Sequence, residues 1–331
     1  MGHFAKIEEI IEDAKKGKIF ILVDDEDREN EGDLIIPAEK CGNQEVNFMA
    51  KFGRGLVCLA LEKERIRELG LPMMALNNNS RHQTAFTISI EAREGITTGI
   101  STLDRAKTIS DAIDSNKDRR DIVSPGHVFP LQAREGGVLV RAGHTEASVD
   151  IAKLANLNPS AVICEIMNDD GTMARRDDLF EFSKKHNLKI ATISELIKYR
   201  TKNDKLIEKI AENKINSSFG GKFIAADYQN KIDNSKYKVL IYGKISEDDN
   251  ILVRMHHLNF NNDILANDLG QNNNLAKSMK IIAKNGSGVV VIFSGSENTD
   301  KIDKSHDNIL RNYGIGAQIL NDIGVKNMVL L

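Results

Sequence analysis

The chain has 331 residues, of which 41% are hydrophobic and 28% charged, enough for the cores of about two globular domains. Its formal net charge of −3 and its lack of tryptophan argue against a nucleic-acid-binding surface. The sequence has no apolar run near the ~20 residues that span a bilayer, and its first residues lack the apolar core of a signal peptide. We therefore expect a cytoplasmic protein with no nucleic-acid and no membrane partner.

The cysteines are odd in number and scattered, at Cys41, Cys58 and Cys164. This arrangement is poor material for a disulfide framework or a zinc site. We expect Cys58 to be a buried free thiol, the usual environment of a structural cysteine.

Segments with the apolar periodicity of helices alternate with segments typical of strands along the first 200 residues. The predicted helices are 4–16, 43–52, 62–69, 101–113, 145–157, 177–187 and 194–200, with Ser101 or Thr102 as the N-cap of the fourth. The predicted strands are 18–23, 33–39, 53–61 (opening with a turn), 83–92, 136–141 (followed by a loop to 144), 160–167 and 188–193. In 83–92 the alternation turns Phe86, Ile88 and Ile90 inward. Because several neighbouring strands look like hairpins, we predict an α+β (mixed α/β) domain with a mixed β-sheet covered by helices.

The composition and the apolar pattern of the sequence change near residue 200. Residues 199–216 are polar with weak apolar periodicity and predict a connecting helix, and asparagine is frequent beyond them. We place the domains at 1–204 and 205–331, the second a smaller α/β domain.

A crowded acidic loop, "DDEDRENEGD" at 24–33, follows the first strand, with seven acidic residues in ten. A solvated turn is the ordinary interpretation of such a run. A calcium loop of the EF-hand type is excluded, because Ala38 stands where a bidentate Glu is required. A magnesium site for a phosphorylated or polyol substrate is the third interpretation, with Arg28 as a clamp inside the acidic run.

A second constellation is "RAGHTEA" at 141–147, where a predicted strand ends at Arg141 and a helix opens at His144. Helix N-termini suit phosphate, and Arg and Thr supply further donors. A lone His there is more often a cap. His127 lies on a Pro- and Gly-rich loop, and Glu165 in an apolar strand. Glu165 is either half of a structural salt bridge or a carboxyl whose pKa burial raises for acid–base chemistry.

Six motifs, in order, resemble 3,4-dihydroxy-2-butanone 4-phosphate synthase: "DDEDRENEGDLI", "GRGLVC", "TTGISTLDRAKTI", "PGHVFPL", "RAGHTEASVDIAKLANL" and "VICEIMNDDGTMAR". They cover nearly all of residues 5–200. The resemblance implies a lyase of riboflavin biosynthesis that converts D-ribulose 5-phosphate to L-3,4-dihydroxy-2-butanone 4-phosphate plus formate. It also implies Mg²⁺ (or Mn²⁺), two ions per active site, and a homodimer whose sites lie near the subunit interface.

The resemblance also implies site residues. Metal ligands would be Glu29 and His144, and the residues required for catalysis His127 and Glu165. Substrate contacts would come from Arg28, Glu29, Asp33, Arg141, Ala142, Gly143, His144 and Thr145, with Arg141 and Thr145 on the phosphate. Ser124 departs from the family's usual Arg, from which we infer no loss of activity. Which of Asp24, Glu31, His127 and Glu165 moves which proton stays open. A non-catalytic phosphosugar-binding protein is the alternative.

The second domain resembles GTP cyclohydrolase II, through "LRNYGIGAQILNDIGVKNMVLL" and "ILVRMHHLNFNNDIL". That enzyme holds a catalytic zinc with three cysteines. This chain has no cysteine after Cys164, Asn259 stands where the first ligand would fall, and "VIFSGSENTDK" replaces the segment that handles GTP. His256 and His257 alone cannot rebuild the site. We therefore expect no zinc and no cyclohydrolase activity, and a structural, dimerising or nucleotide-sensing role; a bifunctional enzyme is the alternative.

Overall fold

The computed structural model describes residues 3–247, 249–258, 263, 273–293 and 306–331. The chain divides into two compact units, Met1–Tyr199 (unit 1) and Arg200–Leu331 (unit 2), and each is described by itself.

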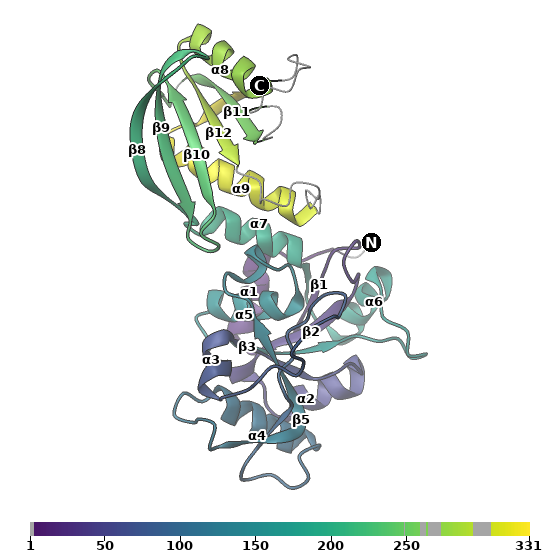
Figure 1. Ribbon diagram of the computed structural model, residues 1–331. Helices are drawn as coiled ribbons and strands as arrows, with labels where there is room; N and C mark the ends of the chain where they lie inside the picture. The colour runs from purple at the N-terminus through teal and green to yellow at the C-terminus, as the bar shows by residue number, and fades with distance from the viewer. Residues whose placement is uncertain (1–2, 248, 259–262, 264–272, 294–305) are drawn as a thin grey trace. The chain divides into compact units, whose positions relative to one another are not determined.

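The described part of unit 1 is built on one mixed sheet with the strand order β4-β5-β3-β6-β2-β1-β7 (Figure 1). The pairs β1–β7 and β3–β5 are parallel, and the others are antiparallel. The strands are β1 (Phe20–Val23), β2 (Gly32–Pro37), β3 (Cys58–Glu62), β4 (Ile90–Ala92), β5 (Ile122–Ala133), β6 (Ser160–Glu165) and β7 (Ile190–Thr192).

Helices cover both faces of this sheet, because each face carries its own apolar cluster. Helices α1, α5 and α7 pack on one face, which we call the α5 face, and α2, α3, α4 and α6 pack on the other. The helices are α1 (Ile7–Lys15), α2 (Asn43–Phe48), α3 (Lys63–Glu68), α4 (Thr102–Ile113), α5 (His144–Leu154), α6 (Arg176–His186) and α7 (Ile193–Asn203). Short helical turns are η1 (Ala38–Lys40), η2 (Met49–Gly53) and η3 (Gly137–Leu139).

Local sequence explains where these helices form. Helix α1 buries Ile7, Ile10, Ile11 and Ala14, spaced on one helical face. Helix α4 begins after Ser101, whose hydroxyl accepts the Asp104 N–H at 3.0 Å and so caps the first turn. The predicted mixed α/β class is confirmed, and of the two N-cap candidates the structure selects Ser101.

Unit 2 holds a second mixed sheet in its described residues, in the order β13-β11-β12-β10-β9-β8. Its strands are β8 (Ile207–Ser217), β9 (Gly221–Asn230), β10 (Lys236–Tyr242), β11 (Asn250–His257), β12 (Gly288–Phe293) and β13 (Asn327–Leu330). Helix α8 (Asn274–Asn285) packs Met279 and Ile282 against the sheet residues Leu240 and Val290. Helix α9 (His306–Ile323) also packs on the sheet, where Gly316 lies against Met255.

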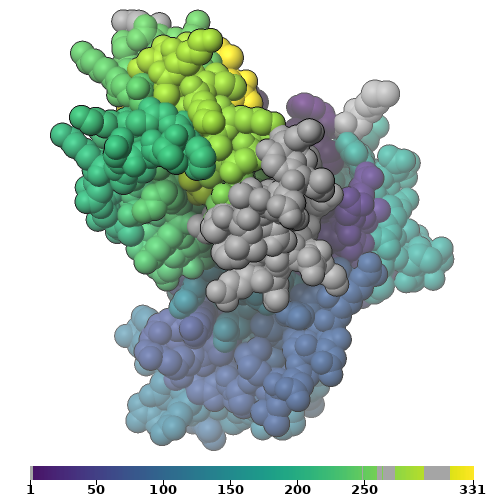
Figure 2. Space-filling view, turned by 45° about the horizontal axis from the view of Figure 1, so that its top comes forward, coloured from purple at the N-terminus to yellow at the C-terminus, as the bar shows by residue number. Residues whose placement is uncertain are grey.

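The connecting helix predicted over 199–216 is wrong. Helix α7 ends at Asn203, and β8 begins at Ile207 and pairs with β9 in a long antiparallel hairpin. Residues 208–216 are exposed along both faces of the strand, and Figure 2 shows teal-green side chains of this part of the chain open at the surface. Because this strand buries neither face, its sequence lacks the alternation of apolar and polar residues by which strands are predicted.

Two strands predicted in unit 1 also differ from the structure. Only Ile90–Ala92 of the strand predicted over 83–92 is regular; Thr87 is buried instead, and Phe86 and Ile88 are half-buried. Residues 136–141, predicted as a strand, form the turn η3 and part of the loop that leads into α5. Gly136 and Gly137 take φ values of +92° and +63°, which extended strands do not use.

Candidate active site

The acidic loop between β1 and β2 is folded around the carboxylate of Asp24, which is 6% exposed. Asp24 Oδ2 accepts a hydrogen bond from Arg28 Nη1 at 2.7 Å and from the Glu29 N–H at 3.2 Å. Its Oδ1 accepts the Glu31 N–H at 2.9 Å. Both oxygens are therefore engaged by the loop itself. Asp24 fixes the path of the backbone that presents Glu29.

Glu29 meets His144 at the first turn of α5. Their atoms Oε2 and Nδ1 are 3.9 Å apart, and His144 Nδ1 lies 3.8 Å from Asp33 Oδ1. Nε2 of His144 bonds the Leu22 carbonyl oxygen at 3.2 Å. A carbonyl only accepts, so Nε2 carries the proton and Nδ1 keeps its lone pair. Ligand atoms of Asp24, Glu29 and His144 all lie within 4.8 Å of one another, a donor set that suits a divalent cation.

Burial sets the protonation of this cluster. It lowers the pKa of the His144 imidazole, which outweighs the opposing effect of Asp24. Burial raises the pKa of Asp33 well above its usual value, and Glu165 adds to the rise. The pKa of Glu31 is raised by burial and then by Glu29. A neutral imidazole beside crowded carboxylates is ready to bind a metal ion, and a cation would relieve the repulsion among the carboxylates.

Glu165 is the neighbour of Asp33 across the antiparallel pair β2–β6. Its Oε2 accepts the Leu56 N–H at 2.8 Å, and a Cβ at Gly55 would lie 2.5 Å from that oxygen. Glycine at 55 therefore allows this close approach. Burial raises the pKa of Glu165, followed by repulsion from Glu29, while backbone N–H groups oppose the rise. No Lys or Arg among the described residues pairs with Glu165, so the structural salt-bridge interpretation is wrong.

His127 lies at the same end of the sheet, on β5, so the loop predicted around it is wrong. Phe129 pairs with Cys58, and Cys58 with Ile163. His127 comes two residues before Phe129 on β5, and Glu165 two residues after Ile163 on β6, so both lie near this end of the sheet. Within the described chain the His127 side chain bonds only Glu91, and it makes no direct contact with the Glu29–His144 cluster.

The 141–145 segment leads into α5. Arg141 lies in a loop and does not end a strand, because η3 and its glycines replace the predicted one. Arg141 Nη1 pairs with Glu146 at 2.7 Å, and its Nη2 donates to the His82 carbonyl at 3.0 Å. A Cβ at Gly143 would lie 2.2 Å from Arg141 Nη1, so glycine leaves room for this pair. Ala142 is half-buried, and Thr145, in the first turn, is 5% exposed.

Arg28 and Arg175 hold Glu29 from two sides. Arg28 Nη1 lies 2.7 Å from Glu29 Oε2, and Arg175 Nη1 donates to the Glu29 carbonyl oxygen at 2.8 Å. Sequence reasoning did not single out Arg175, Glu91 or Glu146 for these contacts. Arg175 ends the sixth motif and Glu146 lies within the fifth, so the motifs mark their places but not their partners; Glu91 lies in none of the six motifs.

The thiols of Cys41, Cys58 and Cys164 are free and buried, which confirms the prediction for Cys58. Burial raises the pKa of the Cys58 thiol well above its usual value, with Glu165 adding to the rise, so Cys58 is protonated at neutral pH. No helix in the described ranges is both long and apolar enough to cross a membrane.

In unit 2 the two histidines of β11 have protein partners. His256 Nε2 lies 2.8 Å from Asp263 Oδ2, and the His257 ring stacks on Phe293 with centroids 5.0 Å apart. Asn259, which the sequence places where a first zinc ligand would fall, lies outside the described residues, as does most of 291–301.

Comparison with known families divides the chain in the same region as its contacts do. The model of the family 3,4-dihydroxy-2-butanone 4-phosphate synthase matches residues 8–199, and that of GTP cyclohydrolase II matches residues 208–331. The chain is similar to a 3,4-dihydroxy-2-butanone 4-phosphate synthase of Photobacterium phosphoreum, with 47% identity over 98% of this chain and 92% of the relative. It is also similar to the riboflavin biosynthesis protein RibBA of Aquifex aeolicus, with 48% identity over 99% of this chain and 87% of the relative.

Two solved structures carry the same likeness. One is RibBX, a two-domain 3,4-dihydroxy-2-butanone 4-phosphate synthase from A. baumannii, with TM-score 0.86 and 41% identity, covering 99% of this chain and 93% of that one. The other is a 3,4-dihydroxy-2-butanone 4-phosphate synthase in complex with two magnesium ions, with TM-score 0.58 and 38% identity, covering 61% of this chain and 99% of that one. The chain belongs to the 3,4-dihydroxy-2-butanone 4-phosphate synthase family of riboflavin biosynthesis, and carries a GTP cyclohydrolase II-like domain behind it.

Proposed function

We propose that the protein is a cytoplasmic lyase that converts D-ribulose 5-phosphate to L-3,4-dihydroxy-2-butanone 4-phosphate plus formate. The observation that carries this proposal is the juxtaposition of Glu29, His144 and Asp33 with Glu165 at one end of the sheet. The reaction must enolise, dehydrate and rearrange the sugar and then release C4, so it needs several proton transfers at one place. A cluster of carboxyls with raised pKa values beside a neutral imidazole supports that chemistry.

We assign Glu29 and His144 as ligands of Mg²⁺ or Mn²⁺, two ions per site. The lone pair on His144 Nδ1 and the carboxylate of Glu29 fit a hard divalent cation, and a family member was solved with two magnesium ions. The cation supplies Lewis-acid stabilisation of negative charge on substrate oxygens. Asp24 contributes indirectly, since its oxygens already accept the loop's own hydrogen bonds.

The substrate's phosphate is assigned to the 141–145 run. Helix α5 begins at His144, and the free N–H groups and positive end of its first turn attract an anion. Arg141 and Thr145 add a guanidinium and a hydroxyl, with Ala142 and Gly143 as the small residues through which the backbone approaches. Arg28 and Asp33 are assigned to the sugar's hydroxyls, next to the cation.

His127 and Glu165 are assigned as the residues required for proton transfer. Glu165 supports this role because burial holds its pKa above the usual value. His127 lies on β5 near the same end of the sheet, with its side chain 44% exposed. Neither is committed to a Lys or Arg partner among the described residues.

A homodimer completes the proposal. Unit 1 leaves several large apolar side chains exposed, and one of them, Leu56, is 42% exposed while its N–H bonds Glu165 of the site. An apolar side chain exposed beside a site residue is a candidate for contact with a second copy of the chain. The exposed residues are Leu56, Met73, Met74, Leu76, Ile100 and Leu103. Sedimentation of a Leu103→Glu variant tests this: we expect a dimer in the wild type and dissociation in the variant, and a monomeric wild type would contradict it.

Unit 2 is proposed to lack cyclohydrolase activity. The chain has no cysteine beyond Cys164, and His256 and His257 are engaged by Asp263 and Phe293. The RibBA name of one relative favours the alternative, a bifunctional enzyme. Elemental analysis and GTP turnover distinguish them: we expect no stoichiometric zinc and no turnover, and finding both would establish the bifunctional enzyme.

Formate release from D-ribulose 5-phosphate, with Mg²⁺ and with EDTA, tests the proposed reaction. We expect turnover that EDTA abolishes and Mg²⁺ restores. Ribulose phosphate binding without formate release would contradict the proposal and favour a non-catalytic phosphosugar-binding protein.

A further inference from the structure

Glu91, on the short strand β4, contacts the ring of His127 on β5. The contact joins Glu91 Oε1 to His127 Nδ1. The Glu91 side chain is 14% exposed and that of His127 is 44% exposed, so the carboxylate is the enclosed partner and the imidazole faces outward. The proposed function uses His127 but gives Glu91 no role.

Two glycines shape the place in which Glu91 sits. A Cβ at Gly99 would lie 1.5 Å from Glu91 Oε1, and a Cβ at Gly126 would lie 2.6 Å from Glu91 Cγ. Real Cβ atoms do not approach other atoms so closely, so both positions need glycine for the carboxylate to lie there. The β4–β5 register also shifts between Ile90 and Glu91, and such irregularities re-aim a side chain.

The partnership determines which ring nitrogen carries the proton. A carboxylate accepts hydrogen bonds and does not donate them, so neutral His127 meets Glu91 with its Nδ1–H. The lone pair then stands on Nε2, the nitrogen away from Glu91. In this arrangement Nε2 is a proton acceptor, and the carboxylate offsets the charge of the imidazolium that forms when it takes up a proton.

We propose that Glu91 is the positioning residue of His127: it holds the imidazole in the Nδ1–H tautomer and in one orientation, with Nε2 presented for proton transfer. This rests on the proposed function, in which His127 exchanges a proton with the substrate. When Nε2 takes a proton from a substrate C–H or O–H, the bonding electrons stay on the substrate as its enediolate or alkoxide. The ring becomes neutral again when the proton is returned.

Kinetics of five variants test the proposal: Glu91→Gln, Glu91→Asp, His127→Gln, the double variant of Glu91→Gln with His127→Gln, and a control. Glu91→Gln removes the charge and offers an amide N–H to Nδ1, which favours the other tautomer; we expect kcat to fall about 100-fold, the low end for lost acid–base catalysis, with KM for D-ribulose 5-phosphate unchanged. Glu91→Asp should recover part of the rate. In a His127→Gln background Glu91→Gln should cost nothing further, because its effect passes through the ring. Glu94→Gln, exposed on the same segment, is the matched control and should keep wild-type kcat.

Nitrogen-15 NMR of histidine-labelled wild-type protein gives a second readout, in which the tautomer is measured with Glu91 in place. The His127 signals, assigned by their loss in His127→Gln, should show a protonated Nδ1 and an unprotonated Nε2 when the ring is neutral. The Nε2–H tautomer would overturn the proposal, as would wild-type kcat in Glu91→Gln or multiplicative losses in the double variant.

The outcomes separate this inference from the proposed function. Absence of formate release by the wild type contradicts the proposed reaction, while the tautomer measurement still decides whether Glu91 orients the ring. A His127→Gln variant with wild-type kcat would overturn the inference, because Glu91 would then have no acting residue to position, and would leave the lyase reaction standing.

Discussion

The Nε2–H of His144 donates to the carbonyl oxygen of Leu22 at 3.2 Å, across 122 residues of sequence. This one hydrogen bond ties the start of α5 to the end of β1, immediately before the acidic loop. It also leaves Nδ1 as the nitrogen that faces Glu29 and Asp33. Backbone partners of this kind fix the orientation of metal-binding histidines.

Removing either assigned ligand should remove most of the cation affinity. We expect His144→Ala and Glu29→Gln each to weaken Mn²⁺ binding by about 100-fold or more, since changes even to the partners of ligands cost 10–100-fold. Titration followed by electron paramagnetic resonance measures it. Glu26→Gln is the matched control, because Glu26 is exposed in the same loop; equal loss there would show a diffuse charge effect instead of a site.

Asp24→Asn should loosen the acidic loop. The two oxygens of the Asp24 carboxylate accept three hydrogen bonds, from Arg28 and from two loop N–H groups. In asparagine one of these oxygens becomes an NH₂ group, which can only donate and so faces another donor. We expect the free energy of unfolding to fall by about 1.5–3 kcal/mol, the range for hydrogen bonds to a charged group. Urea denaturation measures this against Asp27→Asn, an exposed control. An equal, small change in both variants would contradict the role given to Asp24.

The raised pKa of Glu165 predicts a pH dependence of stability. An unfolded chain releases the Glu165 proton around the ordinary glutamate pKa of 4.5. The folded state keeps that proton to higher pH, because its pKa is raised. Between the unfolded and the folded pKa the native state therefore binds more protons, and the free energy of unfolding falls as pH rises through that window. We expect metal-free Glu165→Gln to lack this fall, because an amide does not titrate in this range, while its oxygen can still accept the Leu56 N–H. Thermal unfolding across pH 4–8 checks it; parallel curves would contradict the assignment.

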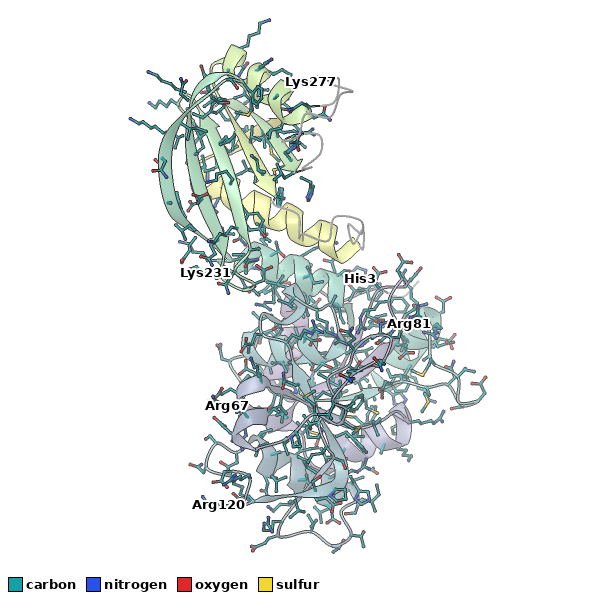
Figure 3. The ribbon with its side chains drawn as sticks, viewed as in Figure 1. His3, Arg67, Arg81, Arg120, Lys231 and Lys277 are labelled. Atoms are coloured by element: carbon teal, nitrogen blue, oxygen red, sulfur yellow. The ribbon has the colours of Figure 1, made fainter. Side chains whose placement is uncertain are left out.

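Arg141→Lys should free the segment around His82. A lysine cannot reproduce the fork that bonds Glu146, the His82 carbonyl and Thr84 at once. Glu146 is 1% exposed, so we expect a loss of about 1–3 kcal/mol in unfolding free energy and faster amide exchange in residues 78–84. Arg81→Lys, on an exposed side chain of this segment (Figure 3), is the control. Unchanged exchange in Arg141→Lys would show that the fork does not hold the segment.

The fold class was predictable because buried elements leave a period in the sequence, as the isoleucines of α1 do. Strand β8 left none, since neither of its faces is buried. The strand predicted at 136–141 was apolar enough, but its glycines adopt positive φ, which composition alone does not reveal.

The site residues were singled out by long motifs, and their partners were not. Glu91 reaches His127 across 36 residues, and Glu146 closes on Arg141 through space that Gly143 leaves empty. Such pairings depend on which strand ends and helix ends meet, and a single sequence does not state this. The roles of the motif residues remain predictions.

The most direct test of the central claim is anomalous diffraction from crystals soaked in Mn²⁺ and D-ribulose 5-phosphate. We predict a peak between the Glu29 carboxylate and His144 Nδ1, with the phosphate of the sugar at the start of α5. Manganese bound elsewhere, with Glu29 and His144 free of metal, would contradict the account.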